Sequence, residues 1–382
     1  MYLALREIRR AKARFALVAG AVGLLGFLIL FQQTLLGNLL GFFTGGLANQ
    51  SGDVVVYGAD ARRNLAGSVV PPPTVDAVAQ VDGVARAGPL YEATFTVRPA
   101  GRPVVDGVLF GYRLGGPGYP TTLSAGRLPV DPFEGVASAV DGGEGFGIGQ
   151  RVTVLAAPGR RPVRIRIVGL AEDLRFSVQP TVFTSEAAFV AARRSTNPGG
   201  AGVPVEPSAV TVETEPGADP DAVAARINRT VPGVEALTRR EAVASAPGVA
   251  ATRQSFGVIL GLAFVVVTLV VGFFLVILVV QKAGALALLR AVGAPVGMLV
   301  RALLLQALLL VAAGLALGVG LLAVAAARSS PTFPISVDPV MVAGTCTTVV
   351  VLALVASGVA VRRVLRIDPL QAALGPTVGG LA

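Results

Sequence analysis

Four long apolar stretches dominate the pattern of hydrophobic and polar positions along the chain. A helix needs about 20 consecutive apolar residues to cross a bilayer, and one Arg or Asp at its centre costs ~3 kcal/mol on insertion scales. All four stretches reach that length without a charged residue. We therefore predict four membrane-spanning helices, at residues 15–43, 256–280, 302–327 and 340–361.

The first span has a basic start, which is also typical of a cleaved signal peptide. The apolar region of such a peptide is only ~7–15 residues long, so we expect this span to remain as an anchor. Gln32 and Gln33 lie in its outer half, where a stalk could begin. We expect both at the membrane interface, and a polar groove for a substrate is the alternative.

Residues 44–250 form the long segment outside the spans, and they mix strand and helix signals. Arg164 and Arg166 alternate with apolar residues, which predicts a strand with one wet face. Asp219 and Pro220 are typical of the N-cap and first position of a helix. We predict an α+β domain in two lobes. Its expected strands are at 53–57, 93–97, 104–110, 152–155, 163–168, 181–184 and 210–213, with a hairpin at 152–168, and its helices are at 75–81 and 222–231.

The charged residues predict how the chain is oriented. The segments 1–14, 281–301 and 362–382 together hold eleven basic and two acidic residues, whereas 44–250 holds 19 basic and 20 acidic ones. Because cytoplasmic segments carry the excess of Lys and Arg, we expect both termini in the cytoplasm and the α+β domain outside. Membrane topology thus explains the formal net charge of +9, and nucleic-acid binding is not expected.

The chain has no His and a single Cys. That composition excludes an internal disulfide, a Cys/His metal site and a catalytic triad that uses His. Ser185-Glu186 and the pair Asp141 and Glu144 come nearest to a hydrolase pattern, but their spacing fits no nucleophile motif, so we expect them on the surface. The Gly-rich segment 142–149 is expected to be a flexible turn before a strand. We predict no catalytic, cofactor-binding or metal-binding residue.

Only two of the 32 basic residues are lysines, Lys12 and Lys282. A Walker A loop needs a Lys directly after a Gly to hold the phosphates of the nucleotide. Neither lysine follows a glycine, so the chain itself is not a P-loop ATPase.

The segment 281–301 joins the second and third predicted spans on the cytoplasmic side. Its pattern predicts a short helix at 283–292, with Leu286 and Leu289 on one apolar stripe, followed by a break at Gly293-Ala294-Pro295. Such a helix would lie on the membrane surface or dock into a groove of a partner. A surface connector without a partner is the alternative.

At this loop and at three other places the chain resembles the FtsX-like permeases, the membrane subunits of the MacB-type ABC systems. The coupling-loop motif of that family is similar to ALALLRAVGAP, and its tail is similar to RVLRIDPLQAAL. Its extracytoplasmic hairpin is similar to GIGQRVTVLAAPGRRPVRIRIVGLAEDLRF, with Gln150 where an Asp is common, and its amphipathic N-terminal helix is similar to MYLALREIRRAKARF. The motifs stand in the family's order around four spans and one large loop.

The resemblance implies a membrane subunit of an ABC transporter that has no enzymatic activity of its own. It would form a homodimer in the plasma membrane and bind a separate cytoplasmic ATPase, which would bind ATP and Mg²⁺. Motion of the spans would then drive the extracytoplasmic domain to export or extract an amphipathic, peptide or lipid-linked substrate. The residues expected to contact the ATPase are Lys282, Leu286, Leu289, Arg290, Gly293, Ala294 and Pro295.

Two other functions stay open at this point. One is a signal transmitter that activates an extracytoplasmic protein partner, such as a cell-wall hydrolase, without transport. The other, a sensing subunit for antimicrobial peptides, ranks lower because relatives in that role usually have more spans.

One position departs from the family's pattern. The acidic residue of the coupling motif falls on Ala285. A basic residue of the ATPase that would pair with that acid has no partner here, so docking is expected to be more apolar or weaker.

Two Gly-x-x-x-Gly pairs permit close packing of helices in the membrane. They are Gly257 with Gly261, and Gly314 with Gly318. The packing would occur either within one subunit or across the dimer.

Overall fold

The computed structural model describes residues 12–197, 203–291, 296–329 and 337–365. They form two compact units. The sheet unit, Gly37–Gln254, holds the strands, and the helical unit holds the apolar helices that precede and follow it in the sequence.

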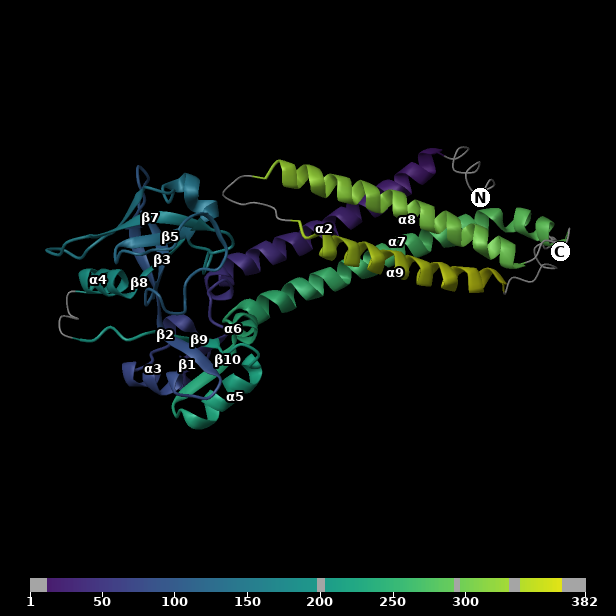
Figure 1. Ribbon diagram of the computed structural model, residues 1–382. Coiled ribbons are helices and arrows are strands. Elements are labelled where there is room, and N and C mark those ends of the chain that lie inside the picture. The colour runs from purple at the N-terminus through teal and green to yellow at the C-terminus, as the bar shows by residue number, and fades with distance from the viewer. Residues whose placement is uncertain (1–11, 198–202, 292–295, 330–336, 366–382) are drawn as a thin grey trace, which may run out of the picture. The chain divides into compact units, whose positions relative to one another are not determined.

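Four helices within the described ranges are long and apolar enough to cross a membrane. Each contains one of the predicted spans, and two of them, α2 and α7, also contribute residues to the sheet unit. The predicted fold class, four membrane helices with one large α+β domain, is confirmed. The four helices are α2 (Lys12–Ala48), α7 (Val249–Ala291), α8 (Val296–Ala327) and α9 (Pro339–Leu365), as seen in Figure 1.

The helix α7 is longer than the predicted span. Its 43 residues correspond to about 65 Å at 1.5 Å per residue, more than twice the ~30 Å of a hydrocarbon core. The predicted short helix at 283–292 therefore continues the span as far as Ala291. A physical reason is that no proline, which would remove a backbone N–H and disfavour helical geometry before it, occurs in α7 ahead of Pro295.

A single ten-stranded sheet runs through the sheet unit in the order β10-β1-β9-β2-β3-β8-β5-β7-β4, and β6 pairs with β2 and β7. The strands are β1 (Val54–Gly58), β2 (Val84–Arg98), β3 (Val105–Tyr112), β4 (Leu123–Gly126), β5 (Glu134–Ser138), β6 (Arg151–Val154), β7 (Val163–Ala171), β8 (Thr181–Ser185), β9 (Ala209–Thr214) and β10 (Val234–Thr238). The α-helices of this unit, beside the ends of α2 and α7, are α3 (Pro72–Ala79), α4 (Glu186–Thr196), α5 (Pro220–Thr230) and α6 (Arg239–Ser245).

The long strand β2 joins two halves of this sheet. Its first half, from Val84 to Leu90, pairs antiparallel with β9, and its second half, from Leu90 to Val97, pairs antiparallel with β3. Figure 1 shows α3 and α5 beside the half that holds β1 and β9, and α4 beside the half that holds β3 and β8. The two predicted lobes are therefore two halves of one sheet that share β2.

Two local predictions in the sheet unit are confirmed. The strands β6 and β7 pair antiparallel as a hairpin, with Val152 opposite Ile165. The helix α5 begins at Pro220, and the Asp219 carboxylate accepts a hydrogen bond of 3.2 Å from the Asp221 N–H. Turn and capping residues act over a few positions, which is why the sequence reveals them.

Two residues that we predicted at the surface are buried. Asp141 is 1% exposed and Ser185 is 3% exposed. Ser185 is the N-cap of α4: its Oγ accepts from the Ala188 N–H at 3.0 Å and donates to the Pro132 carbonyl at 2.5 Å. Glu144, by contrast, has a side chain that is 46% exposed. The prediction failed for Asp141 and Ser185 because the partners that justify their burial are 34 and 53 positions away.

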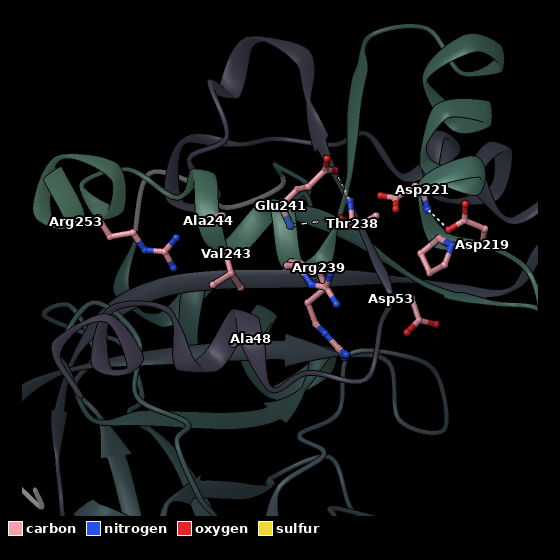
Figure 2. Close-up of a pocket in the computed structure, with 12 residues that line it drawn as sticks. Ala48, Asp53, Asp219, Asp221, Thr238, Arg239, Glu241, Val243, Ala244 and Arg253 are labelled. Carbon is pink, nitrogen blue, oxygen red and sulfur yellow. Dashed lines mark hydrogen bonds between the residues drawn. The ribbon is translucent and has the colours of Figure 1, made fainter. Parts of the chain in front are cut away.

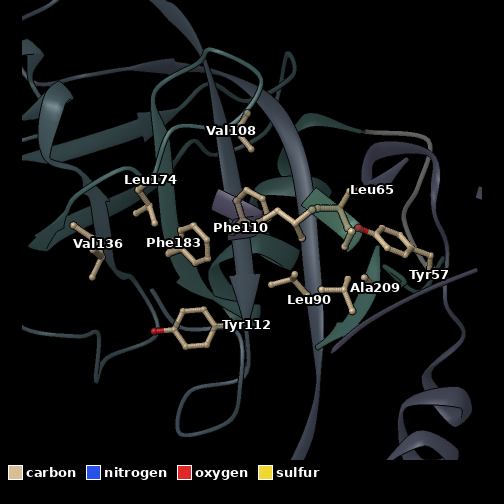
Figure 3. Close-up of a cluster of buried hydrophobic side chains, with 14 of the residues drawn as sticks. Tyr57, Leu65, Leu90, Val108, Phe110, Tyr112, Val136, Leu174, Phe183 and Ala209 are labelled. Carbon is tan, nitrogen blue, oxygen red and sulfur yellow. The ribbon is translucent and has the colours of Figure 1, made fainter. Parts of the chain in front are cut away.

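Aromatic side chains fill the middle of the sheet unit (Figure 3). The rings of Phe110 and Phe183 are stacked, with centroids 4.6 Å apart. Leu90 from β2 and Leu174 from the loop after β7 belong to the same buried cluster, and so does Leu47 from the end of α2. The end of α2 is therefore part of the core of the sheet unit.

Candidate functional site

The last turns of α2 are bonded to the loop that follows β7. The Gly46 N–H donates to the carbonyl of Arg175 at 3.1 Å. In return the carbonyls of Phe42 and Phe43 accept hydrogen bonds from the N–H groups of Val178 and Ser177, at 2.9 and 3.1 Å. Backbone bonds of this kind fix the helix axially as well as sideways. We call residues 42–49 and 173–178 together the α2 junction; all of them lie within the sheet unit.

Two glycines make this close approach possible. A Cβ on Gly45 would overlap the carbonyl oxygen of Asp173, and a Cβ on Gly46 would lie 2.8 Å from a ring carbon of Phe110. Both distances are shorter than carbon atoms tolerate, so the helix can meet the loop only where it lacks side chains. The Asn49 amide adds a hydrogen bond of 2.7 Å to the Asp173 carbonyl.

A buried ion pair lies beneath the junction. The Arg175 guanidinium donates to the Asp141 carboxylate, with Nη2 2.5 Å from Oδ1 and Nε 3.2 Å from both oxygens. The same guanidinium lies over the ring of Phe42, 4.9 Å from its centroid. Charge-assisted bonds of this geometry are stronger than neutral ones, and the ring face adds a favourable cation–π contact. Arg175 thus ties α2 to the segment that follows β5.

The loop side of the junction is strained. Asp173, Ser177 and Val178 have positive φ angles of 50°, 51° and 63°. Left-handed backbone costs of order 1–3 kcal/mol for such residues and is least expected for a β-branched Val. The contacts with α2 and a 2.8 Å bond from the Phe176 N–H to Thr181 Oγ1 hold the loop in this conformation. The conformation of this loop therefore lowers the folding stability of the sheet unit.

Four of the seven residues predicted to contact an ATPase lie towards the C-terminal end of α7. Lys282, Leu286, Leu289 and Arg290 are on the C-terminal part of α7. Gly293, Ala294 and Pro295 lie outside the described residues, so the structure brings only the first four onto one element.

The two glycine pairs differ in their surroundings. A Cβ on Gly314 would lie 2.8 Å from Val22 Cγ1, and one on Gly318 would lie 2.8 Å from the Gly23 carbonyl, so α8 packs closely on α2 within this chain. No heavy atom of the described residues, outside their own helical turn, lies within 4 Å of a Cβ built on Gly257 or Gly261.

Polar residues of the first span are bonded within the helical unit. Gln33 Oε1 accepts a hydrogen bond of 2.5 Å from Thr345 Oγ1 of α9. Gln32 Nε2 donates to the Phe256 carbonyl of α7 at 3.5 Å. These two side chains join α2 to its neighbours. Among the residues that the structure describes, no group of three His, Cys, Asp or Glu side chains could hold a metal ion.

The Gly-rich segment before β6 is a hydrogen-bonded turn. Gly145 and Gly149 have positive φ angles of 93° and 84°. Gln150 Oε1 accepts a hydrogen bond of 2.6 Å from the Gly147 N–H, which closes the turn.

Comparison with known proteins shows which family and which relatives the chain resembles. Residues 257–369 match the family model described as FtsX-like permease C-terminal. This match shows that the C-terminal part of the chain is similar to the FtsX-like permeases. Two uncharacterised ABC transporter permeases of Mycobacterium tuberculosis resemble this permease along its whole length. One is 28% identical over 387 residues and the other 26% identical over 391 residues, and each match covers 98% of this chain and 100% of the relative.

Two solved structures resemble this permease over about half of its chain. The periplasmic region of MacB from Actinobacillus actinomycetemcomitans has a TM-score of 0.36 and 10% identity, covering 51% of this chain and 92% of that one. The extracellular domain of the noncanonic ABC-type transporter YknZ from Gram-positive bacteria has a TM-score of 0.33 and 14% identity, covering 49% and 100%.

The sequence revealed part of this site and missed the rest. Local patterns predicted the spans and the close helix packing at Gly314 and Gly318. Gly257 and Gly261 make no such contact within the described residues, and the role of the C-terminal part of α7 stays a prediction. The α2 junction was missed, although Gly45-Gly46 at the end of an apolar helix is a signal that could have indicated a close contact. Nothing in the sequence links Arg175 to Asp141, because the pairing depends on the order of strands in the sheet.

Proposed function

We propose that this ABC permease passes movement driven by a separate cytoplasmic ATPase to its sheet unit, which lies outside the membrane. The movement serves export or extraction of an amphipathic, peptide or lipid-linked substrate. The α2 junction is the observation that carries this proposal. The helix α2 runs without a break from Lys12 to Ala48, and its last turns are bonded into the core of the sheet unit.

The charge distribution supports the orientation in this proposal. The excess of basic residues in 1–14, 281–301 and 362–382 favours these segments in the cytoplasm, with both termini there. The C-terminal part of α7 would then face the ATPase, and the sheet unit would face outward. A homodimer fits an ABC system because two ATPase subunits act together on two permease subunits.

The mechanical part of the proposal follows from stiffness. An α-helix is held by a bond at every residue, so a displacement of α2 at the membrane reaches Ala48 without being absorbed by a loop. At the junction the displacement acts on Phe42, Phe43 and Gly46, and through them on the segment 175–178. Arg175 carries it on to Asp141, beside β5. The half of the sheet that holds β3 and β8 would move with the helix.

Spin labels can test this movement. We would replace Cys346 by Ser, introduce Arg160→Cys in the exposed turn between β6 and β7, and measure the distance between the labels of two subunits in nanodiscs that also contain the ATPase. We expect the distance distribution to change between the nucleotide-free and the vanadate-trapped states. The further substitution Arg175→Ala should remove most of this change while ATP hydrolysis continues.

Three outcomes would contradict the proposal. An unchanged distribution on nucleotide trapping would exclude the movement, and a missing dipolar signal would exclude the homodimer. A full response in the Arg175→Ala protein would exclude the junction as the route. A signal transmitter would show the same movement without export of any substrate, so transport into the medium distinguishes that function.

A further inference from the structure

A groove of about 900 Å³ on the sheet unit, where α2 ends and α7 begins, carries both signs of charge. It is lined by four carboxylates and three guanidiniums, and Figure 2 shows Arg253 at one side with Asp219 and Asp221 at the other. Hydrogen bonding to a carboxylate favours its charged form, so this lining selects neither anions nor cations. A surface with one predominant sign of charge lies elsewhere on the sheet unit, over the strands β2, β6 and β7.

Six strands of the sheet close into a ring. The path β2-β3-β8-β5-β7 is closed by β6, which pairs with both β7 and β2. The inside of the ring on these last three strands is apolar, because one buried cluster contains Val97, Val152, Val154, Ile165 and Ile167. Neighbouring positions on a strand face opposite sides. The residues that alternate with these five therefore lie on the outer surface of the ring.

Four of these outward residues are exposed arginines, Arg98 on β2, Arg151 on β6, and Arg164 and Arg166 on β7. The strand register places Arg151 directly opposite Arg166, and it places Thr153 opposite both Arg98 and Arg164. Residues opposite one another on antiparallel strands share a face, with Cα atoms about 4.5–5.5 Å apart. We call the four arginines together with Thr153 the arginine face.

The charges around the arginine face leave it strongly positive. Within the described ranges, none of its four guanidiniums takes part in an ion pair. Beside it, Glu134 is bonded to Arg127 at 2.6 and 2.7 Å, and Glu144 pairs with Arg102 at 3.4 Å. Both of these pairs are balanced. The exposed Asp106 on β3 remains, so four guanidiniums stand against one carboxylate, a net charge of +3.

Sheet stability alone does not favour this arrangement. Like charges directly opposite on paired strands are destabilising, and Arg151 and Arg166 form such a pair. Threonine has a high strand propensity and would keep these outward positions wet without repulsion, as Thr153 does between Arg98 and Arg164. The repulsion also falls on a short strand, because β6 has only four residues. The negative charge of a ligand would remove it.

Three observations narrow the class of ligand. The strand β6 is paired on both sides, so it offers no free edge to the backbone of a peptide. The arginine face contains no large apolar side chain, which the core of a protein interface needs. Across the ring from β6 lies β8, whose Phe183 belongs to the cluster that contains Leu47 of α2. Within the sheet unit the face is therefore on the opposite side from the α2 junction, which disfavours a lipid surface.

We propose that the arginine face binds a phosphodiester polymer outside the membrane. The planar donors of Arg match two phosphate oxygens at once. Arg164 and Arg166 are two positions apart on β7, about 6.8 Å along the strand. A glycerol phosphate unit has six backbone bonds and spans at most about 7 Å, twice the reach of one amino-acid residue. The polymer's charges thus match the spacing of the arginines. The proposal rests on the proposed function only for the outward placement, which excludes nucleic acid as the polymer.

Fluorescence anisotropy with the full chain in phosphatidylcholine nanodiscs would test the proposal. The probe is a fluorescein-labelled hexamer of glycerol phosphate, and hexaglutamate with the same label is the comparison. The test variant is Arg151→Gln with Arg166→Gln, which removes the opposed pair. The matched control is Arg229→Gln with Arg240→Gln, because it removes the same charge from two exposed arginines outside the face. Urea unfolding guards against a folding defect, since relief of the repulsion should leave the test variant at least as stable as the unaltered chain.

We expect the unaltered chain to bind the glycerol phosphate hexamer more tightly than hexaglutamate. For a single-stranded polyanion, the logarithm of the binding constant falls with the logarithm of salt concentration by about 0.7 for each phosphate contacted. Four contacts give a slope of about −3, and the test variant should show roughly half of it. Each contact then contributes about 5-fold at 0.1 M salt, so the test variant should bind roughly 25-fold more weakly. The control should bind nearly as the unaltered chain does.

Several results would overturn the proposal. Equal binding by the test variant and the unaltered chain would exclude the arginine face, and an equal loss in the control would show charge attraction without a site. Equally tight binding of hexaglutamate would mean that phosphate is not what the face recognises. Displacement of the hexamer by millimolar glycerol 3-phosphate would mean that a single phosphate group, and not a polymer, is the ligand. The measurement needs no ATPase and no nucleotide, so its failure is separate from failure of the proposed function.

Discussion

The buried ion pair between Arg175 and Asp141 offers a quantitative test of the α2 junction. The substitution Arg175→Ala removes the three bonds to Asp141 and the contact with the Phe42 ring. It also leaves the Asp141 carboxylate, 1% exposed, without its counter-charge. Breaking a buried pair in this way costs about 3–5 kcal/mol. Because a domain is stable by only about 5–15 kcal/mol, the sheet unit should be weakened but still folded.

Urea titration of the full chain in detergent micelles would measure this loss. The sheet unit should unfold first because the apolar helices remain in the micelle, and pulse proteolysis would report the unfolded fraction. Arg102→Ala is the matched control. Its ion pair with Glu144 has a distance of 3.4 Å, and both side chains are nearly half exposed, 48% and 46%. An exposed pair contributes about 0–1 kcal/mol, so the control should change little.

A double variant separates the net contribution of the pair from the penalty of leaving one charge alone. Replacing both partners by apolar residues of similar size, Arg175→Met with Asp141→Leu, should recover most of the loss. The reasoning is refuted by a loss below about 1 kcal/mol for Arg175→Ala. It is also refuted if the double variant is as unstable as the single one, because the cost would then come from packing.

Three further predictions test other parts of the account. Glu92 is 7% exposed, and burial raises its pKa from 4.5 to about 7, against the opposing effect of the Arg193 charge. Because the pKa of Glu92 is higher in the folded than in the unfolded state, its stabilising contribution is complete below pH 4.5 and is lost as the pH rises through 7. The unfolding free energy of the sheet unit should therefore fall by up to about 3 kcal/mol over this pH range. Urea unfolding at a series of pH values should show a weaker dependence of this free energy on pH for Glu92→Gln, and an equal dependence would contradict the assignment. Gly314→Leu should lower the midpoint of thermal unfolding of the helices, measured by circular dichroism. The new Cβ would lie 2.8 Å from Val22 Cγ1, and overpacking of this kind costs about 1–3 kcal/mol. Gly257→Leu should have no such effect in the monomer, and an equal loss in both would show that the contact with α2 is not the cause. With Cys346 replaced by Ser, a cysteine at position 160 should react with a membrane-impermeant maleimide in intact cells and one at position 12 should react only after lysis; the reverse result would invert the topology.

The sequence predicted those parts of the fold that depend on neighbouring residues. Uninterrupted apolar runs identify the spans, and Asp219-Pro220 identifies the start of α5. It did not predict where α2 and α7 end, because hydrophobicity indicates where a helix crosses a membrane but not how far the helix continues in water. The helix α2 extends to Ala48 because its last turns are covered by the loop after β7.

The candidate site was less accessible from the sequence because its partners are distant. Arg175 and Asp141 are 34 residues apart and meet only after β5 and β7 pair in parallel. At the α2 junction, Asn49 and Asp173 are 124 residues apart and are joined by a hydrogen bond of 2.7 Å. Burial and hydrogen bonding decided these roles, and neither follows from residue type alone.

The central claim is that this permease works through a separate ATPase that binds the C-terminal part of α7. Affinity purification of the tagged full chain from its native membranes tests it most directly. The account predicts that an ABC ATPase co-purifies in stoichiometric amount, that Leu289→Asp abolishes its association, and that Leu289→Ile retains it. Absence of an ATPase from the unaltered preparation would contradict the claim, and undiminished association with the Leu289→Asp protein would contradict the assignment of this segment.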